Sequence, residues 1–319
     1  MRVSVVIPCF RDSATLGRAL DSVLDQSRPA DEIIVVNDAS PETKEIESVL
    51  AAYPQVKYIV NATNLGLAAT RNVGVRVTSA DIVSFLDADD ELHPQKIELQ
   101  LSLFRPESAV SSSISRIGGE RGVDRVVNYQ SQARFSVFQD SSQLIRRNRL
   151  TGASIMVSRE LFLSLGGYDE TLRSCEDFDL WLRLLDKGIT VLNVELPLYL
   201  YRCNENGLSR NLLNISRWEL EVVRKYYERH RSAQGQTLRE AVTFGMWLFK
   251  HQIRCEQCRD PRLIEATRRN LDLVSASPFV RALLLVAQRI RLAWIVHRLL
   301  SAKDSLLKLV HKWHRRRNP

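Results

Sequence analysis

Short apolar runs alternate with helix-like patterns over about the first ninety residues of the chain. The runs are rich in β-branched residues and show no strict polar alternation, so they predict strands buried on both faces of a parallel sheet. Between them, apolar residues such as Leu16, Leu20 and Val23 recur at helical spacing. The predicted strands cover residues 3–7, 32–36 and 56–60, and a fourth ends at Asp87.

This alternation predicts an α/β fold with a doubly wound, mostly parallel sheet flanked by helices, because right-handed βαβ crossovers produce that arrangement. In such sheets ligands bind beyond the carboxyl ends of the strands. Four loops follow such ends, and their polar residues are expected to face one crevice. The loops contain Phe10 with Arg11, Asp38, Asn64, and Asp87 with Asp89.

The stretch Phe85-Leu86-Asp87-Ala88-Asp89-Asp90 places three carboxylates within four residues at the end of a strand. Carboxylates this close repel one another, which favours a site where a divalent cation or sugar hydroxyls lie between them. The alternative is a solvated Asp-rich loop that caps the helix beginning near Gln95. The convergence of the other three loops favours the site.

The pattern is less regular beyond this point. Residues 108–150 contain serine and glycine clusters, which predict a hairpin or loop that covers the crevice. Further strands are expected at residues 152–157, 189–194 and 198–202, and a helix begins at Glu176 and Asp177. After Ser209 the segments become long, basic and helix-forming.

The formal charge of +8 is unevenly distributed along the 319 residues. Residues 211–319 contain 22 Lys and Arg against 9 Asp and Glu, whereas residues 1–210 contain 23 against 28. The two parts are therefore expected to have different roles, with a domain boundary near residue 210. The basic part carries no recognised DNA or RNA motif, so no nucleic-acid partner is expected.

The five cysteines form no evident disulfide framework, which suits a reducing compartment. Cys255 and Cys258 form a lone C-x-x-C pair, and two small residues on a helix explain it better than a zinc site does. The sequence shows no signal-peptide pattern and no run of about 18 uncharged apolar residues. A cytoplasmic protein is therefore expected.

Several short motifs in order across residues 3–209 resemble the inverting glycosyltransferases of family 2. Each motif is weak alone, but their joint order is specific. They are Val5-Val6-Ile7-Pro8, Gln26-Ser27, residues 32–40, Asn64-Leu65-Gly66, Arg71-Asn72-Val73-Gly74, Asp87-Ala88-Asp89-Asp90, Gly166-Gly167-Tyr168-Asp169-Glu170, Glu176-Asp177 and Tyr201-Arg202.

The resemblance implies a GT-A type fold over residues 1–210 and transfer of a hexosyl or N-acetylhexosaminyl group from a nucleotide-diphosphate sugar, expected to be a UDP-sugar. The acceptor would be a hydroxyl of a lipid-linked or surface-glycan precursor. The Gln-x-x-Arg-Trp signature of processive synthases is absent, so one sugar per binding event is expected. Two departures are Arg11, where the family commonly has Asn, and Asn37, where it commonly has an acid.

By the same resemblance, Pro8, Phe10 and Asp38 would form the nucleoside pocket, which Arg11 would join. Taken alone, Pro8, Phe10 and Asp38 would more simply be a strand terminator, a core aromatic and a helix cap. Two further residues, Asn64 and Arg71, would bind the ribose or diphosphate; the alternative for Arg71 is a surface charge on a helix.

Asp87 would contact the ribose and the metal shell, and Asp89 would bind Mn²⁺ or Mg²⁺ that bridges the diphosphate oxygens. Asp90 is expected to cap the following helix. The resemblance makes Asp177 the catalytic base, with Glu176 beside it; otherwise both would only complement the helix dipole.

Three weaker candidates, Tyr201, Arg202 and Ser209, would close over the diphosphate.

Two other functions fit parts of the pattern. A sugar nucleotidyltransferase would need a glycine-rich triphosphate loop, which is missing after the first strand. A non-catalytic sugar-binding module would be expected to lose the acid pairs, which are present.

The C-terminal stretch from Phe279 to Pro319 combines ten Lys and Arg with many large apolar residues. This composition predicts a helix that lies in an anionic membrane interface, where Arg315, Arg316 and Arg317 add attraction. The alternative is packing on the rest of the protein or on a second copy of the chain, since the apolar residues nearly encircle the segment.

Overall fold

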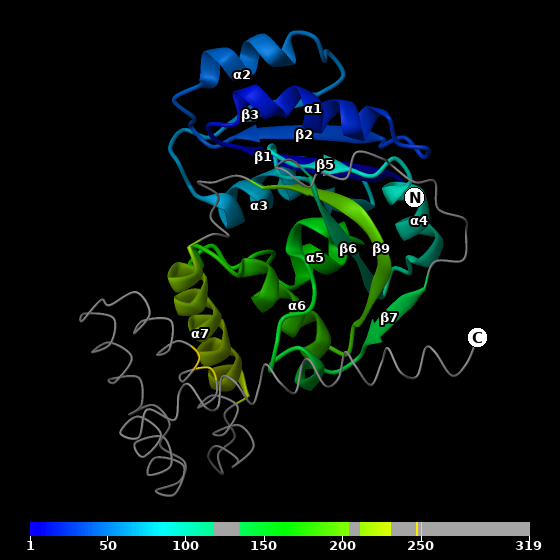
Figure 1. Ribbon diagram of the computed structural model, residues 1–319, viewed down its shortest axis with the longest axis vertical. Helices are drawn as coiled ribbons and strands as arrows, with labels where there is room; N and C mark the ends of the chain where they lie inside the picture. Colours follow the sequence, from blue (N-terminus) through cyan, green and yellow to red (C-terminus); the bar gives the residue numbers. More distant parts are fainter. Residues whose placement is uncertain (118–133, 204–210, 231–246, 248–249, 251–319) are drawn as a thin grey trace, which may run out of the picture. The chain divides into compact units, whose positions relative to one another are not determined.

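The computed structural model describes residues 1–117, 134–203, 211–230, 247 and 250. The chain divides into two compact units, Met1–Asn211 and Leu212–Pro319. The first unit contains the sheet and the predicted site residues (Figure 1).

Four parallel strands form the first half of the sheet, as predicted. They are β1 (Val3–Cys9), β2 (Glu32–Asn37), β3 (Lys57–Val60) and β4 (Ile82–Phe85). Strands β1 and β2 are mostly apolar and buried, as expected of strands covered on both faces; the buried polar residues in them are Ser4 and Asn37.

The second half of the sheet is mixed. It contains β5 (Glu91–Leu92), β6 (Ser108–Ile117), β7 (Phe135–Phe138), β8 (Met156–Ser158) and β9 (Thr190–Arg202). The order is β3-β2-β1-β4-β8-β6-β9-β5, with β7 paired to β9. Because β8 runs antiparallel to both β4 and β6, and β9 runs parallel to β6, six strands share one direction. The predicted fold class is confirmed.

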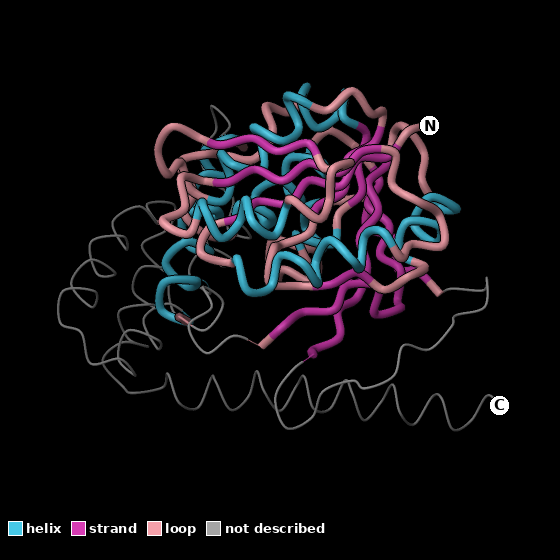
Figure 2. The backbone as a smooth tube through the Cα atoms, turned by 90° about the horizontal axis from the view of Figure 1, so that it is seen from above, coloured by secondary structure: helices cyan, strands magenta, loops and turns pink. Residues whose placement is uncertain are grey.

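Helices cover both faces of the sheet (Figures 1 and 2). On one face, α1 (Ser13–Leu24), α2 (Thr43–Leu50) and α4 (Lys96–Leu103) enclose the main apolar core with the odd-numbered residues of β1. On the other face lie α3 (Leu67–Val77) and α5 (Arg159–Ser164). There Gly74 approaches Val6 so closely that a Cβ would lie 2.3 Å from it, and Phe85 packs against Phe162. The helix α6 (Glu176–Asp186) carries the predicted base.

The prediction for residues 108–150 is wrong at its start, because residues 108–117 form β6 inside the sheet. The buried part of this strand contains Ser108, Ser111 and Ser112 in place of large apolar residues. Because these residues are polar, the hydrophobic pattern of the sequence does not predict this strand. Ser111 Oγ and Ser154 Oγ lie 2.8 Å apart, so the buried hydroxyls satisfy one another.

Two other boundaries differ from the prediction. Thr190–Arg202 form one long strand, β9, not two, because register shifts near Ser113 accommodate Pro197 within the ladder. The expected strand at 152–157 is a 3₁₀ turn, Gly152–Ser154, followed by the short β8. That turn positions the candidate base.

The second unit begins with α7 (Leu212–Arg229), an amphipathic helix whose buried residues include Leu220 and Val223. Lys250 Nζ lies 2.8 Å from Glu219 Oε2. None of the described helices is long and apolar enough to cross a membrane. The predicted C-x-x-C helix and the basic tail lie outside the described residues.

Candidate active site

Asp90 fixes the carboxylate-rich loop after β4 to strand β9. Tyr199 Oη donates to Asp90 Oδ2 at 2.7 Å, and the amide of Arg202 donates to Asp90 Oδ1 at 2.7 Å. Burial, followed by the charges of Asp87 and Asp89, raises the pKa of Asp90 to about 8. The expectation that Asp90 caps the next helix is wrong, because α4 has no side-chain cap and Asp90 is directed at β9.

Asp12, which follows β1, is a further carboxylate near Asp89. Burial and the charge of Asp87 raise the pKa of Asp89. Burial, together with the charges of Asp89, Asp87 and Glu42, raises the pKa of Asp12 to about 6. Asp12 makes no side-chain cap for α1. Its place just after β1, at the same sheet edge, was the available signal for including it in the site.

These carboxylates do not form a complete metal cage. Among the described residues, no group of three or more His, Cys, Asp or Glu side chains is arranged to hold a metal ion. A magnesium site in enzymes usually takes only one or two protein carboxylates and completes its shell with substrate phosphates and water. Burial and the neighbouring carboxylates raise the pKa values of Asp12 and Asp89, and a bound cation would relieve that repulsion, which fits such a partial site.

Arg71 joins the carboxylate loop to the start of α6. Its Nη2 lies 2.5 Å from Asp87 Oδ1, and its Nη1 lies 2.6 Å from Glu176 Oε1. Arg71 is 2% exposed, so the alternative of a surface charge is wrong. The two neighbouring carboxylates outweigh its burial and raise its pKa. The guanidinium therefore forms a buried ionic bridge between the loop after β4 and α6. Glu176 is one of its two carboxylate partners.

Asp177 is held at the first turn of α6 by backbone donors. The amide of Gly152 donates to its Oδ2 at 3.0 Å, and the amide of Phe178 donates to its Oδ1 at 2.7 Å. Burial, and then the charge of Glu176, raises the pKa of Asp177 to about 7. A Cβ on residue 152 would lie 2.1 Å from Asp177 Cβ, so glycine is required there. Cys175 enters the helix with φ of 61°, which turns the chain sharply before it.

The end of β1 presents an aromatic ring and a guanidinium at the surface. Phe10 is 38% exposed, and Arg11 Cζ lies 5.3 Å from the centroid of its ring. The amide of Arg11 donates to Ser40 Oγ at 3.0 Å, which joins this loop to the loop after β2. Pro8 is buried within β1, two residues before Phe10.

Asp38 organises the loop after β3. It is buried, and its carboxylate accepts from the amides of Leu65 and Gly66 at 2.8 and 2.9 Å. Asn61 Nδ2 also donates to it at 2.8 Å. The exposed Asn64 donates through Nδ2 to the carbonyl of Asp38 at 3.2 Å. Three donors already engage the Asp38 carboxylate, so its contact with a base stays a prediction.

Arg202 lies at the end of β9, against the carboxylate loop. Its Nε donates to the carbonyl of Asp89 at 3.1 Å, and its Nη2 pairs with Glu91. Tyr201 precedes it on β9, whereas Ser209 lies outside the described residues. Closure over a diphosphate by these residues stays a prediction.

The fold and the site define an α/β transferase of the GT-A type, with carboxylates at the carboxyl ends of parallel strands and a further carboxylate, Asp177, in the first turn of α6. Residues 4–166 match the family model described as Glycosyl transferase family 2, just over half of the chain. The chain belongs to that family and is a glycosyltransferase. The predicted family is confirmed.

Curated relatives agree with this assignment. An uncharacterized glycosyltransferase of Haemophilus influenzae is 28% identical over 70% of this chain and 76% of its own length. The Escherichia coli protein UDP-Glc:alpha-D-GlcNAc-diphosphoundecaprenol beta-1,3-glucosyltransferase WfgD is 23% identical over 71% of this chain and 87% of its own. By contrast, the matched region spans only 31% of an uncharacterized Rickettsia felis glycosyltransferase.

A solved structure has the same fold. Residues 1–349 of S. aureus TarS match with a TM-score of 0.57 and 18% identity, covering 79% of this chain and 72% of that one. At this identity the similarity establishes the GT-A architecture.

Proposed function

We propose that this chain transfers one sugar from a UDP-sugar to a hydroxyl of a lipid-linked or surface-glycan acceptor, with inversion at the anomeric carbon and Asp177 as general base. The observation that carries the proposal is the geometry of Asp177. Two backbone amides hold its carboxylate, its pKa is raised to about 7, and Glu176 and Arg71 connect its helix to Asp87. A base with a pKa near the working pH transfers protons efficiently.

Relatives support the choice of donor and acceptor. The name of WfgD states a UDP-glucose donor and a diphosphoundecaprenol-linked acceptor. Another relative, from Erwinia amylovora, is named for amylovoran biosynthesis and is 27% identical over 62% of this chain. TarS has been crystallised with UDP and with UDP-GlcNAc.

In the proposed reaction, the Asp177 carboxylate takes the proton from the acceptor hydroxyl. The hydroxyl oxygen attacks the anomeric carbon from the face opposite the diphosphate. The bond from that carbon to the diphosphate oxygen breaks, and UDP leaves with the electron pair. A single displacement of this kind inverts the anomeric configuration.

The departing diphosphate gains negative charge, which Mn²⁺ or Mg²⁺ would stabilise as a Lewis acid when bound. Asp89 is the proposed ligand, with Asp87 beside it in the metal shell. Asp89 suits this role because its carboxylate is half-buried near other acids, whereas one oxygen of Asp87 already accepts from Arg71. Arg71 thus orients Asp87.

The nucleoside is proposed to stack on Phe10, with Arg11 at its edge. Asp38 and Asn64 shape the loop after β3 that would close the ribose side. Arg202 would add positive charge near the diphosphate.

The proposal is tested with Asp89→Asn. Loss of one carboxylate should abolish transfer and remove the Mn²⁺-dependent part of UDP binding, as measured by calorimetry with and without chelator. The exposed Asp25→Asn variant controls for the loss of a negative charge elsewhere. UDP binding by the wild type that is equally tight in chelator would contradict the metal assignment, and a product with retained configuration would contradict the single displacement.

A further inference from the structure

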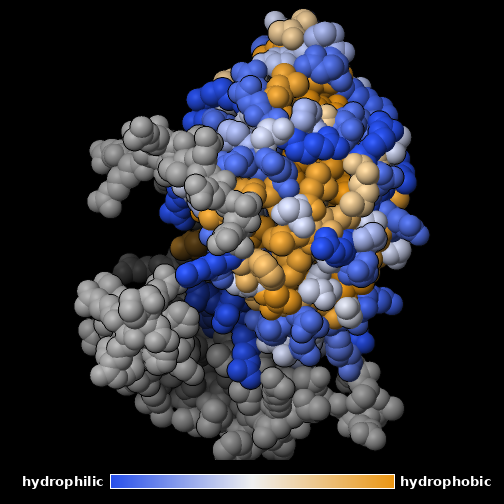
Figure 3. Space-filling view, turned by 90° about the vertical axis from the view of Figure 1, so that its right-hand side faces the viewer, coloured by the Kyte–Doolittle hydropathy of each residue, from blue (hydrophilic) through white to orange (hydrophobic). Residues whose placement is uncertain are grey.

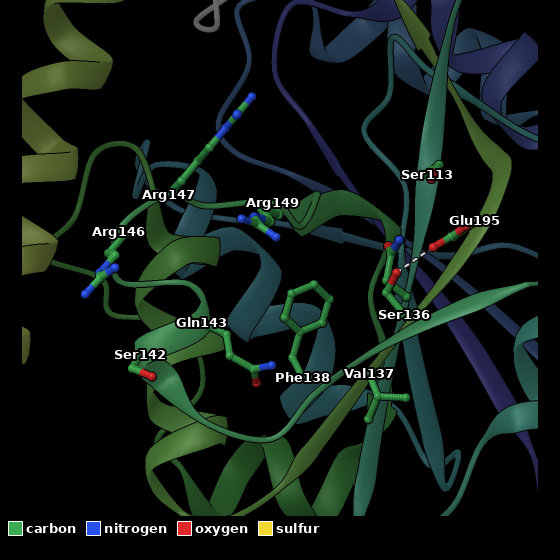
Figure 4. Close-up of a pocket in the computed structure, with 11 residues that line it drawn as sticks. Ser113, Ser136, Val137, Phe138, Ser142, Gln143, Arg146, Arg147, Arg149 and Glu195 are labelled. Carbon is green, nitrogen blue, oxygen red and sulfur yellow. Dashed lines mark hydrogen bonds between the residues drawn. The ribbon is translucent and has the colours of Figure 1, made fainter. Parts of the chain in front are cut away.

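A pocket of 740 Å³ opens beside the sheet, away from the proposed donor loops. Its walls come from β6, β7, β9 and the segment that contains Gln143 and Arg149 (Figure 4). No residue of the loops after β1 to β4 lines it. A volume of this order accommodates a small-molecule group of drug-like size or larger.

The pocket carries excess positive charge. Arg146, Arg147 and Arg149 line it and are exposed, against a single carboxylate, Glu195. Within the described part of the chain, neither Arg146 nor Arg149 has an ion-pair partner. Glu195 accepts from Ser136 Oγ at 2.6 Å on the wall opposite Arg149 (Figure 4). Guanidinium groups match phosphate oxygens in a bidentate geometry, so this lining favours a phosphate or diphosphate over a neutral sugar.

The pocket also has an apolar side. Val137 and Phe138 of β7 line it, and Phe135 and Val137 are 47% and 41% exposed. Phe135 and Val137 are two residues apart and so lie on one face of the strand. Hydrophobic surface is visible on the side of the molecule that carries β7 (Figure 3). An anionic group attached to an apolar chain would satisfy both parts of this lining.

Two residues that line the pocket are near neighbours in sequence of residues that hold the turn at the candidate base. Arg149 precedes Gly152 by three residues, so their Cα atoms lie within about 10 Å, and the amide of Gly152 holds Asp177. On the other wall, Ser113 lines the pocket directly after Ser112, whose amide donates to Ser154 Oγ in the same 3₁₀ turn. A group bound here would lie near the turn that holds the base and outside the loops that are proposed to bind the donor.

We propose that this pocket binds the phosphate or diphosphate that joins the acceptor sugar to its lipid, with the first apolar units of the lipid along β7. This inference rests on the proposed function, because it identifies the acceptor side of the same site. Arg149 would orient the phosphate, and the attached sugar would extend toward Asp177.

A binding experiment tests the pocket without requiring transfer. Titration calorimetry with farnesyl diphosphate in chelator removes any metal-dependent binding at the donor loops. Arg149→Gln and Arg146→Gln should weaken binding about tenfold or more, as expected for lost charge-assisted hydrogen bonds. The exposed Arg18→Gln on α1 is the matched control and should bind like the wild type.

Two further probes separate the parts of the ligand. Inorganic pyrophosphate should bind more weakly than farnesyl diphosphate but with the same sensitivity to Arg149→Gln. Farnesol that binds as tightly as farnesyl diphosphate would overturn the proposal. Equal affinities for farnesyl diphosphate in Arg149→Gln, Arg146→Gln and Arg18→Gln would also overturn it.

Kinetics then distinguish this pocket from the proposed reaction. With a prenyl-diphosphate-linked sugar as acceptor, Arg149→Gln should raise the acceptor KM about tenfold or more and leave the donor KM unchanged. With the same sugar as an uncharged octyl glycoside, the variant should match the wild type. A wild type that transfers no sugar refutes the proposed function, whereas an equal rise for both acceptors refutes the phosphate site.

Discussion

At the scale of single residues, Asp177 has the properties of a base that must be ionised before it can act. Burial and the charge of Glu176 raise its pKa to about 7, far above that of an exposed Asp. Below that pH, the proposed base is protonated and cannot accept the acceptor's proton. The same shift lowers stability as pH rises, because ionised Asp177 is less favourable in the folded state than in the unfolded state.

Asp177→Asn should lower kcat by about 10²–10⁴-fold with little change in UDP affinity, because it removes a base and not a donor contact. In the wild type, kcat/KM should rise with pH through about 7 and then level off. Between pH 4 and 7, the wild type should lose stability relative to Asp177→Asn as pH rises. Retained turnover in the variant, or a flat pH profile, would refute the assignment.

Gly152→Ala should displace Asp177, since the new Cβ would lie 2.1 Å from Asp177 Cβ. We expect turnover to fall by at least about tenfold, with UDP affinity preserved. The matched control is Gly17→Ala in α1, where the nearest atom to a new Cβ is 3.5 Å away. That control should keep its activity and gain up to about 1 kcal/mol of helix stability. Equal activity in the two variants would show that Gly152 does not position the base.

At the scale of elements, Arg71 connects helix α3 to the loop after β4 and to the start of α6. A buried charge with two carboxylate partners is costly to break, because removing it leaves both acids uncompensated. Through these two contacts, the Arg71 side chain sets the distance between Asp87, in the proposed metal shell, and Glu176, next to the proposed base.

Arg71→Met should destabilise the fold by about 3–5 kcal/mol in urea unfolding. A double-mutant cycle with Glu176→Gln should give a coupling energy above about 1 kcal/mol. The exposed pair formed by Arg76 of α3 and Glu170, 3.5 Å apart, is the control and should couple by less than about 1 kcal/mol. Similar coupling in both pairs would contradict the bridge.

The sequence predicted the first half of the sheet well, because β1 to β4 are continuous apolar runs whose carboxyl ends bear the polar loops. It also placed Asp177 at the start of a helix. It did not reveal β6, because this strand buries serines, one of which, Ser111, has its partner Ser154 in another segment. Nor could it reveal the role of Arg71, whose partners Asp87 and Glu176 lie 16 and 105 residues away along the chain.

At the scale of the whole molecule, the basic tail beyond residue 279 lies outside the described residues, and its contact with an anionic membrane stays a proposal. Its charge would bring the enzyme to the surface where a lipid-linked acceptor resides. Arg315, Arg316 and Arg317 should each add about 1 kcal/mol of attraction to anionic lipid.

The full chain with all three of these arginines changed to Gln should therefore bind vesicles containing anionic lipid more weakly than the wild type, by about tenfold or more. Co-sedimentation at moderate salt measures this. Neutral vesicles are the control and should show little difference. Equal sedimentation of both proteins with anionic vesicles would favour a packing role for the tail.

The pairing of β4 with β8 has a consequence for how the protein is made. Val83 lies opposite Val157, so one edge of β4 has no partner until a further stretch of more than 70 residues has left the ribosome. Translation at 5–20 residues per second makes this an interval of roughly 4–15 s. The ladder between β6 and β9 closes later still, since Ser108 pairs with Thr190. During synthesis, the first half of the sheet, β1 to β4, therefore has an exposed apolar strand edge that is prone to aggregation. Cells that produce this enzyme rapidly should need chaperones to shield that edge.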